Sequence, residues 1–378
     1  MMTEREILYW LSSVACAGRK TIRTLLENAD PLSGLFEFDS ETLELLQVPE
    51  ELRSQLRDPE KAADETRRAM KRDRDIGIRF LTFRDPDWPE RLSLIPDPPL
   101  WLHVRGSVPA AGEQTAAIIG SRGADIYGLR MAEFISRELA VRKISVISGM
   151  ADGIDGAAQK EAVLAGGKSY AVLGCGVNIC YPNTNYELFR ALSEEGHGGI
   201  VSEFAPGTPP AQWHFPDRNR LIAGLCDCLI VVEARGAKSG SQITVSCALD
   251  QGKEVFAVPG RLTDPLSRGC NDLIRNGANI LTSPDDVLSF LGMQRTGMML
   301  PEKEDLSGLF PEEQRVYGCL RGADPRPMEE IVRESGLRPG EVMSILLKLE
   351  LRGLAVRSSG DYYAAALRRR KKKSLPPR

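Results

Sequence analysis

The middle of the chain alternates short apolar runs with longer amphipathic stretches. The apolar runs have the length and the β-branched content of buried strands. They are TAAIIGS, ISVISGM, SYAVLGCG, GGIVSEF, DCLIVVEA and KEVFAVPG. Helical patterns such as GLRMAEFISRELAVRK and QKEAVLAGG separate them. Because β and α patterns alternate at this spacing, the sequence predicts an α/β fold with a doubly wound parallel sheet.

The two flanking segments have helical patterns instead. Near the amino terminus, EREILYWLSSVACA, TIRTLLENA and EKAADETRRAMKRD predict a small helical domain. It could be a helix-hairpin-helix DNA module or a plain helical cap, and the weak glycine-rich hairpin in CAGRKTI leaves both open. Near the other end, three short helical patterns and a hairpin with a Gly-Asp turn predict a winged helix, whose second helix-turn-helix element begins at Pro339.

These patterns divide the chain into five expected parts. They are a helical domain (1–77), an extended α/β domain (78–292), a polar linker (293–310), a winged-helix domain (311–367) and a basic tail (368–378). The α/β part begins with a proline-rich entry segment, DPDWPERLSLIPDPPLWLHVRG, which has short strands at either end.

Charge is distributed unevenly along the chain. The net charge of the 378 residues is −3, but the tail RRRKKKSLPPR holds seven Lys or Arg and no acid, so the rest of the chain carries about −10. Such a block predicts a disordered tail that is attracted to phosphates, with a purely solubilising role as the alternative. Eight cysteines without a CxxC pair and three histidines argue for reduced thiols and against a metal site.

The sequence carries no sign of a membrane or export segment. Its first residues, MMTEREILYW, place acids before any apolar stretch. No run approaches the roughly 18 apolar residues that a membrane helix needs. We therefore expect a cytoplasmic protein without a membrane partner.

Small residues follow the predicted strands at what should be one edge of the sheet. The strand ends read IIGSRG, SGMADG, LGCG, EARGAKSGS and VPGR. Glycines let a ligand approach the backbone N–H groups, and helices that start just afterwards direct their positive ends at it. Arg122 adds a charge there, and HFPDRNRLIAGL adds Arg218 and Arg220. An ion pair with Asp217 is the alternative for these two arginines, and a core position is the alternative for Phe215.

The usual nucleotide motifs do not fit this edge. The first turn, GSRGAD, is not GxGxxG, and GGKS at 166–169 runs from a helix into a strand, which is the reverse of a P-loop. NAD and ATP are therefore poor candidates, and we expect no cofactor. No GxSxG elbow exists, and His214 is the only histidine near the edge. Single-stranded DNA supplies both phosphates for the arginines and bases to stack on Phe215.

An ordered set of motifs resembles one known family. The motifs are AIIGSRGADIYG, ISGMADGIDGAA, LGCGVNICYP, SEFAPG, HFPDRNRLIAGL, VVEARGAKSGSQIT, VPG and GCNDLIRNGA. Over roughly residues 78–281 the chain resembles the DNA-processing protein A family, also called DprA or Smf. The resemblance implies a Rossmann-like protein that binds and protects single-stranded DNA and assists loading of RecA recombinase during natural transformation or recombination. It also implies a homodimer without catalytic turnover.

The resemblance also implies a set of DNA-contacting residues. They are Gly120, Ser121, Arg122, Ser148, Gly149, Phe215, Arg218, Asn219, Arg220, Lys238, Ser239, Gly240 and Ser241. One departure is Gln159, where many members of the family have a histidine, and this weakens any expectation of proton chemistry.

Two other classes of protein remain as alternatives. Nucleotide-cleaving phosphoribohydrolases share this kind of sheet, but their PGGxGT loop is missing, since the chain has VPGRLT and AKSGSQIT instead. A transcription regulator would read DNA with its winged helix. Residues 340–352 have the mixed charges of Glu341, Lys348, Glu350 and Arg352, with an acid at the start of the helix, which favours a protein-contact or accessory module.

Overall fold

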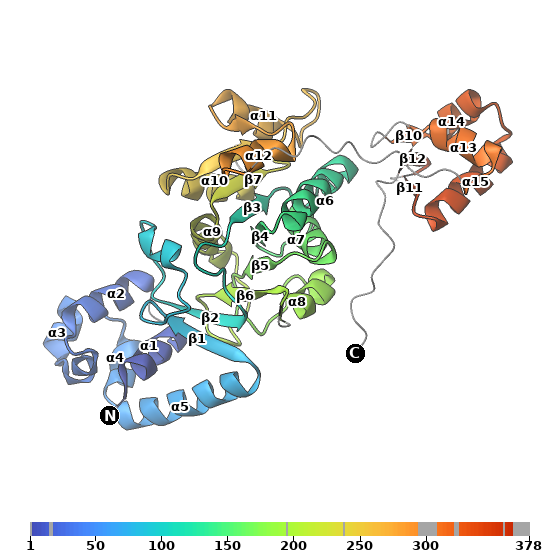
Figure 1. The fold of residues 1–378 in the computed structure, drawn as a ribbon. Helices are drawn as coiled ribbons and strands as arrows, with labels where there is room; N and C mark the ends of the chain where they lie inside the picture. Colours follow the sequence, from blue (N-terminus) through green and yellow to red (C-terminus); the bar gives the residue numbers. More distant parts are fainter. Residues whose placement is uncertain are drawn as a thin grey trace.

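The computed structural model describes residues 2–14, 18–193, 196–236, 239–293, 308–320, 325–357 and 360–365. Its centre is a nine-stranded sheet with the order β1-β2-β6-β5-β4-β3-β7-β8-β9 (Figure 1). The strands are β1 (Ile78–Thr82), β2 (Trp101–Gly106), β3 (Thr115–Ile119), β4 (Ser145–Ser148), β5 (Ser169–Val172), β6 (Gly198–Ser202), β7 (Cys228–Val231), β8 (Glu254–Ala257) and β9 (Asn279–Ile280).

The sheet is parallel from β6 to β9, which confirms the predicted doubly wound, Rossmann-like class. The proline-rich entry segment adds β1 and β2, and both of these pair antiparallel, β2 with β6 at the edge. The chain builds outwards from β3 in one direction as far as β6, then returns and places β7 on the other side of β3. The strand order therefore reverses between β3 and β7, and this is where a doubly wound sheet opens a crevice.

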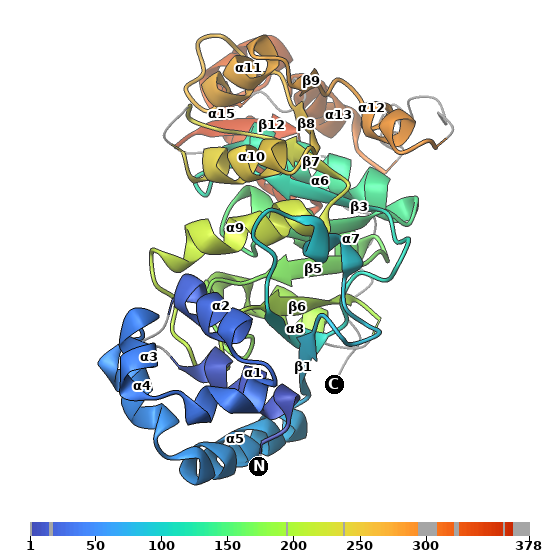
Figure 2. The ribbon, with the colours of Figure 1, turned by 90° about the vertical axis from the view of Figure 1, so that its left-hand side faces the viewer.

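Helices cover both faces of the sheet. They are α6 (Ile126–Val141), α7 (Ile154–Leu164), α8 (Tyr186–Ser193), α9 (His214–Leu225), α10 (Gly240–Asp250), α11 (Arg268–Arg275) and α12 (Pro284–Phe290). In Figure 1, α6, α7 and α8 lie on one side of the sheet and α9 and α10 on the other; Figure 2 looks onto the second side. Every residue of β3 is buried, as its unbroken apolar run predicts for a strand covered on both faces.

The amino-terminal helices are joined to the sheet by a shared core. They are α1 (Glu4–Ser13), α2 (Arg19–Asn28), α3 (Ser40–Leu45), α4 (Glu50–Leu56) and α5 (Pro59–Asp75). Phe80 of β1 and Trp101 of β2 belong to the same buried cluster as Ile7 and Leu11 of α1. The rings of Tyr9 and Phe80 meet edge to face at 5.1 Å. This helical segment therefore covers the antiparallel edge of the sheet, where both views place it.

A winged helix forms the last part that the structure describes, as predicted. It consists of α13 (Pro311–Gly318), α14 (Met328–Ser335), α15 (Pro339–Leu351) and a three-stranded sheet in the order β10 (Arg326–Pro327), β12 (Tyr362–Ala365), β11 (Ala355–Arg357). Its core is its own, with Val316, Ile331, Leu346 and Leu349 buried in one cluster.

Within the described ranges, no helix is both long and apolar enough to cross a bilayer. The predicted linker falls largely outside those ranges, and the basic tail falls wholly outside them.

Candidate functional site

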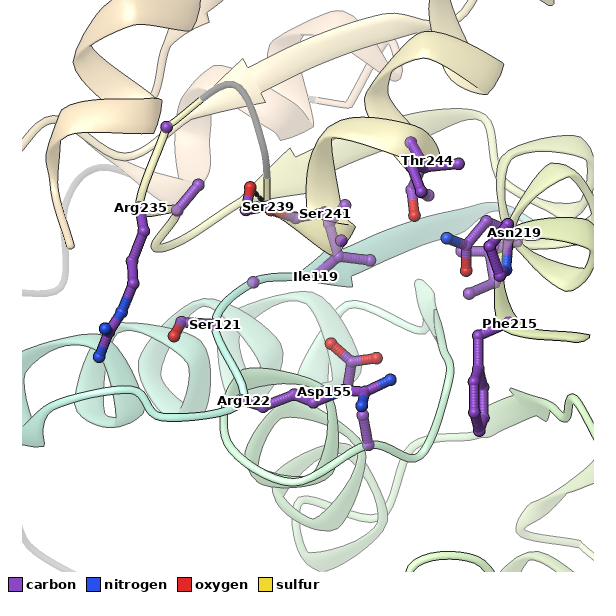
Figure 3. Close-up of a pocket in the computed structure, with 18 of the residues that line it drawn as sticks. Ile119, Ser121, Arg122, Asp155, Phe215, Asn219, Arg235, Ser239, Ser241 and Thr244 are labelled. Atoms are coloured by element: carbon purple, nitrogen blue, oxygen red, sulfur yellow. Dashed lines mark hydrogen bonds between the residues drawn. The ribbon is translucent and has the colours of Figure 1, made fainter. Parts of the chain in front are cut away.

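A cavity of about 950 Å³ lies where the strand order reverses. Its walls come from the loop after β3, the loop after β7 and the first turns of α9 and α10 (Figure 3). Loops that leave neighbouring strands on opposite sides of this point diverge, and the space between them becomes a binding crevice. The volume is at the upper end of the range for small-molecule sites and has room for a nucleotide. We call this cavity the switch-point pocket.

Most of the predicted contact residues lie around this pocket. Nine of them line it directly, and they are Gly120, Ser121, Arg122, Phe215, Arg218, Asn219, Ser239, Gly240 and Ser241. Gly149 lines a smaller adjoining hollow of about 40 Å³. Lys238 lies outside the described residues.

Ser148 and Arg220 are placed differently from the prediction. The Ser148 hydroxyl is fully buried and donates a hydrogen bond of 2.6 Å to the carbonyl of Ile118, so it joins β4 to β3. Arg220 donates to Glu203 at 2.7 Å and to Asp97 at 3.0 Å. Neither residue lines the switch-point pocket.

Helical geometry explains the position of Arg220. Phe215, Arg218, Asn219 and Ile222 are three or four residues apart along α9 and share the face that lines the pocket. Arg220 is two residues from Arg218 and therefore projects from nearly the opposite side of the helix. The Asp217 ion pair that the sequence suggested for these arginines is not formed with either of them in the described structure; Asp217 pairs with Arg19 at 3.2 Å.

Arg218 stabilises the inner wall of the pocket. Its side chain is 5% exposed and donates to the carbonyls of Gly149, at 3.0 Å, and Val172. Burial lowers the pKa of Arg218 to about 10, while the nearby carboxylate of Asp155 opposes this shift. Burial raises the pKa of Asp155, and the charge of Arg218 and an N–H donated by Gly149 at 3.1 Å oppose that. Arg218 and Asp155 are therefore electrostatically coupled within the wall of the pocket, although these two described residues make no direct ion pair.

Two glycines are required for this wall. A Cβ atom on Gly149 would lie 2.4 Å from the Arg218 guanidinium, so any side chain there would displace it. Gly153 precedes α7 with φ of +77°, and a Cβ atom there would lie 2.2 Å from the carbonyl oxygen of Ser121. The loops after β3 and β4 can therefore pack together only because these positions lack side chains.

An aromatic platform lies where the pocket meets the smaller hollow: Phe215 lines both, and Tyr181 lines the hollow. The Arg122 guanidinium lies over the Phe215 ring at 5.2 Å, and the Tyr181 ring stacks beside Phe215 at 5.7 Å with an interplanar angle of 28°. Tyr181 is 41% exposed and Phe215 is half-buried. Phe215 is partly buried and is therefore not a fully buried core residue. The sequence analysis did not predict Tyr181 as a site residue. It lies in the loop after β5, and no pattern around CYP indicates that it contacts α9.

A positive rim surrounds the pocket mouth. Arg122 and Arg235 are exposed at the loops after β3 and β7, and Arg268 of α11 is 78% exposed, 4.0 Å from Asp272. The first turn of α10 also faces the pocket, and Ser239 makes no side-chain capping hydrogen bond there. The positive end of a helix dipole favours a phosphate at such a place. Arg235 lies in the strand end EARGAKSGS, so the sequence already indicated a positive charge at this edge of the sheet.

The remaining candidate side chains are occupied by packing. His214 stacks on Phe204 at 4.0 Å, and its Nδ1 lies 3.0 Å from the carbonyl oxygen of Gly174. Gln159 is fully buried; it accepts from the Met150 N–H and donates to Ser169 and Tyr170. Among the described residues, no three His, Cys, Asp or Glu side chains gather as metal ligands would.

The fold and the site together define a class. The chain is a Rossmann-like α/β protein with a crevice at its switch point and a winged helix near its carboxyl end. A family model described as DNA recombination-mediator protein A matches residues 79–292, and one described as the DprA winged helix domain matches residues 301–361. The chain belongs to the DNA recombination-mediator protein A (DprA) family.

Individual relatives agree with this assignment. Protein Smf of Escherichia coli is 37% identical over 73% of this chain and 74% of its own length. A putative DNA processing protein DprA of Mycobacterium tuberculosis is 35% identical over 81% of each chain. The crystal structure of DprA from Streptococcus pneumoniae superposes with a TM-score of 0.61 at 30% identity, covering 76% of this chain and 98% of that one.

A second solved structure, of a relative from Helicobacter pylori, is also similar to this chain. It is described as the single-stranded DNA binding mode of DNA processing protein A from Helicobacter pylori. It superposes with a TM-score of 0.50 at 28% identity, covering 56% of this chain and 95% of that one.

Proposed function

We propose that this protein binds single-stranded DNA in the switch-point pocket, protects it, and assists loading of RecA recombinase during natural transformation or recombination. Family membership supports the proposal, and so does the single-stranded DNA binding named for the Helicobacter pylori relative. The observation that carries it is the contact of Arg122, Phe215 and Tyr181 beside the first turn of α10. Proteins that bind single strands combine such stacking rings with cations and helix ends for the backbone.

The phosphates and the bases of a single strand would bind different parts of the site. The phosphates would lie along Arg122, Arg235 and the start of α10, where charge and helix dipole act together. A base would stack on the Phe215 and Tyr181 rings, a contact worth roughly 1–3 kcal/mol per base in such proteins. Double-stranded DNA keeps its bases stacked inside the duplex and could use only the first part.

We propose binding without catalytic turnover, which argues against the phosphoribohydrolase alternative. The two carboxylates that line the pocket both interact with protein groups. Asp155 is 7% exposed and accepts the Gly149 N–H at 3.1 Å, and Asp272 lies 4.0 Å from Arg268 and 2.9 Å from Arg275. A general base needs a carboxylate that can reach substrate. His214 is held by stacking and by its Gly174 contact.

We propose a protein-contact role for the winged helix, in preference to a regulator that reads DNA. Met343, Leu347 and Leu351 lie four residues apart on α15 and are 54%, 56% and 82% exposed. Glu341 at the start of α15 pairs with Arg338 at 2.5 Å. An apolar stripe with an acid at the helix start is a poor match to a phosphate backbone. We also propose that the protein contacts RecA, forms a homodimer and acts in the cytoplasm.

A binding titration tests the proposal. The full chain is titrated against a fluorescent single strand and against the same sequence as a duplex, at two salt concentrations. We expect tighter binding of the single strand, with an advantage that persists at the higher salt because stacking is not screened. Equal affinity for both forms, falling together with salt, would leave only phosphate attraction and would contradict the proposed site. Release of free base from nucleoside monophosphates would instead support the hydrolase.

A further inference from the structure

Two side chains of the switch-point pocket have polar atoms that are open to the pocket and have no partner in the described protein. Asn219 of α9 is 8% exposed and Thr244 of α10 is 3% exposed, and both line the pocket. Within the described ranges, the Asn219 amide nitrogen donates to nothing and the Thr244 hydroxyl makes no hydrogen bond. Figure 3 shows both side chains directed into the open space between the two helices. Both groups can therefore bind water in the empty pocket, and a ligand that enters the pocket can take the place of that water as their hydrogen-bond partner.

The orientation of the Asn219 amide is fixed by its neighbour. Arg218 Nε lies 3.3 Å from Asn219 Oδ1. A guanidinium nitrogen can only donate, so the amide oxygen must face it and the NH₂ group must face the pocket. The pocket therefore presents a committed donor at Asn219. Thr244 adds a hydroxyl that can either donate or accept.

The surroundings of these two groups suit a flat heterocycle. Ile119, Ile222 and Ile243 line the same pocket and supply apolar walls. The phosphate-binding features of the rim, Arg122 and the first turn of α10, lie at the same cavity. A nucleotide whose phosphate is held at the rim could place its base between the isoleucines, with the polar edge on Asn219 and Thr244.

We infer that the inner pocket receives one unstacked base of single-stranded DNA and prefers a keto base to an amino base. This inference rests on the proposed function. Thymine, uracil and guanine present a carbonyl oxygen beside a ring N–H, so the oxygen accepts from Asn219 and the N–H donates to Thr244. Cytosine and adenine present an amino group where the Asn219 donor stands. Two donors then face each other in a buried site, and a site built this way rejects the wrong partner strongly.

Uracil and cytosine provide the sharpest comparison, because the two bases differ only along this edge. The full-length protein is titrated by fluorescence anisotropy with dU15 and dC15. We expect dU15 to bind about ten-fold more tightly, within the range of base-edge discrimination by a hydrogen-bonding side chain. Equal affinity for the two oligonucleotides overturns the inference and leaves the pocket as a site for DNA of any sequence. No binding of either one overturns the proposed function as well.

Variants assign the preference to a residue. Asn219→Asp keeps the oxygen that faces Arg218 but replaces the free donor with an acceptor, so the dU15 to dC15 affinity ratio should fall to one or below. Thr244→Val should weaken both oligonucleotides several-fold and keep the ratio, because a hydroxyl serves either base. Thr66→Val is the matched control. Thr66 of α5 is also 3% exposed, but it does not line the switch-point pocket.

The variants also show what would refute the assignment. A ten-fold preference that survives Asn219→Asp in a folded protein overturns the role of Asn219. Should Asn219→Asp fail to fold, as judged by its melting curve, the wild-type ratio and the response to Thr244→Val still decide. A Thr244→Val protein that binds both oligonucleotides like the wild type contradicts a base at this position.

Discussion

At the scale of single residues, the site separates side chains that face the ligand from side chains that hold the pocket together. Arg122 is exposed and Phe215 is partly buried at the pocket wall, so the loss of Arg122 should leave the packing intact. Arg218 is 5% exposed and engages the backbone of two strand ends. Replacing Arg218 would leave the two buried carbonyls without their donor and would remove the positive charge that acts on Asp155, so its loss would affect folding as well as binding.

The stability of the folded protein should depend on pH through the buried carboxyl of Glu233. Glu233 is 1% exposed, directly before the pocket loop, and its Oε1 has no hydrogen-bond partner. Burial, with the carboxyl of Asp125 next to it, raises the pKa of Glu233 to about 8. The folded protein therefore binds a proton that the unfolded chain releases above about pH 4.5. The stability contributed by protonated Glu233 is full below that pH and is lost as the pH rises through 8.

A substitution at this position tests the linkage. Glu233→Gln keeps the shape and a donor toward Asp125 but cannot ionise. Its free energy of unfolding, relative to that of the wild type, should therefore increase from pH 5 to pH 9. The gain should be on the order of 2 kcal/mol, since each pKa unit is worth about 1.4 kcal/mol and solvent relaxation reduces the effect. Urea unfolding at the two pH values measures it. A constant difference between the proteins would show that Glu233 is ionised throughout.

At the scale of elements, the amino-terminal helices and the sheet are thermodynamically coupled. Phe80 and Trp101 belong to strands of the sheet but are buried in the core of α1–α5. A fragment of residues 78–292 contains the whole switch-point pocket but exposes both rings. We expect it to fold with about 3–6 kcal/mol less stability than residues 2–293, at roughly 1.5–3 kcal/mol for each of the two exposed side chains.

Binding by the same fragment separates the pocket from the flanking helices. Because every lining residue lies within it, its affinity for a single strand should stay within a few-fold of that of the longer chain at a temperature where both are folded. Parallel melting and anisotropy measurements provide the comparison. A folded fragment that has lost binding would place the site outside this pocket, and equal melting temperatures would contradict the shared core.

The same elements show what the sequence could predict. Strands buried on both faces leave continuous apolar runs, so all six runs became strands. The small residues after β3 and β7 line the switch-point pocket, and their role in binding an anion stays a prediction. The order of the strands could not be predicted, because crossovers depend on packing between distant segments. The prediction for α9 named Arg218 and Arg220 together, although residues two apart cannot share a helix face. Tyr181 reaches Phe215 only through the fold.

At the scale of the whole molecule, the switch-point pocket and the exposed apolar side chains of α15 lie on different parts of the chain. The pocket lies at the centre of the α/β part, and the apolar stripe of α15 lies on the winged helix. The basic tail at 368–378 remains a predicted phosphate-attracting segment, independent of the pocket chemistry. In this account, the pocket provides the distinction between single strands and duplex, and the tail adds salt-sensitive affinity for both.

The central claim is that single-stranded DNA occupies the switch-point pocket, and the most direct test is the salt dependence of its binding by three single variants. Phe215→Ala should lose roughly 1–3 kcal/mol of affinity at unchanged slope. Arg122→Ala should lower the magnitude of the log–log salt slope by about 0.7, the value for one single-strand phosphate contact. Arg190→Ala, which removes a 41% exposed arginine outside the pocket, should change neither. Wild-type affinity and slope in both folded pocket variants would contradict the account.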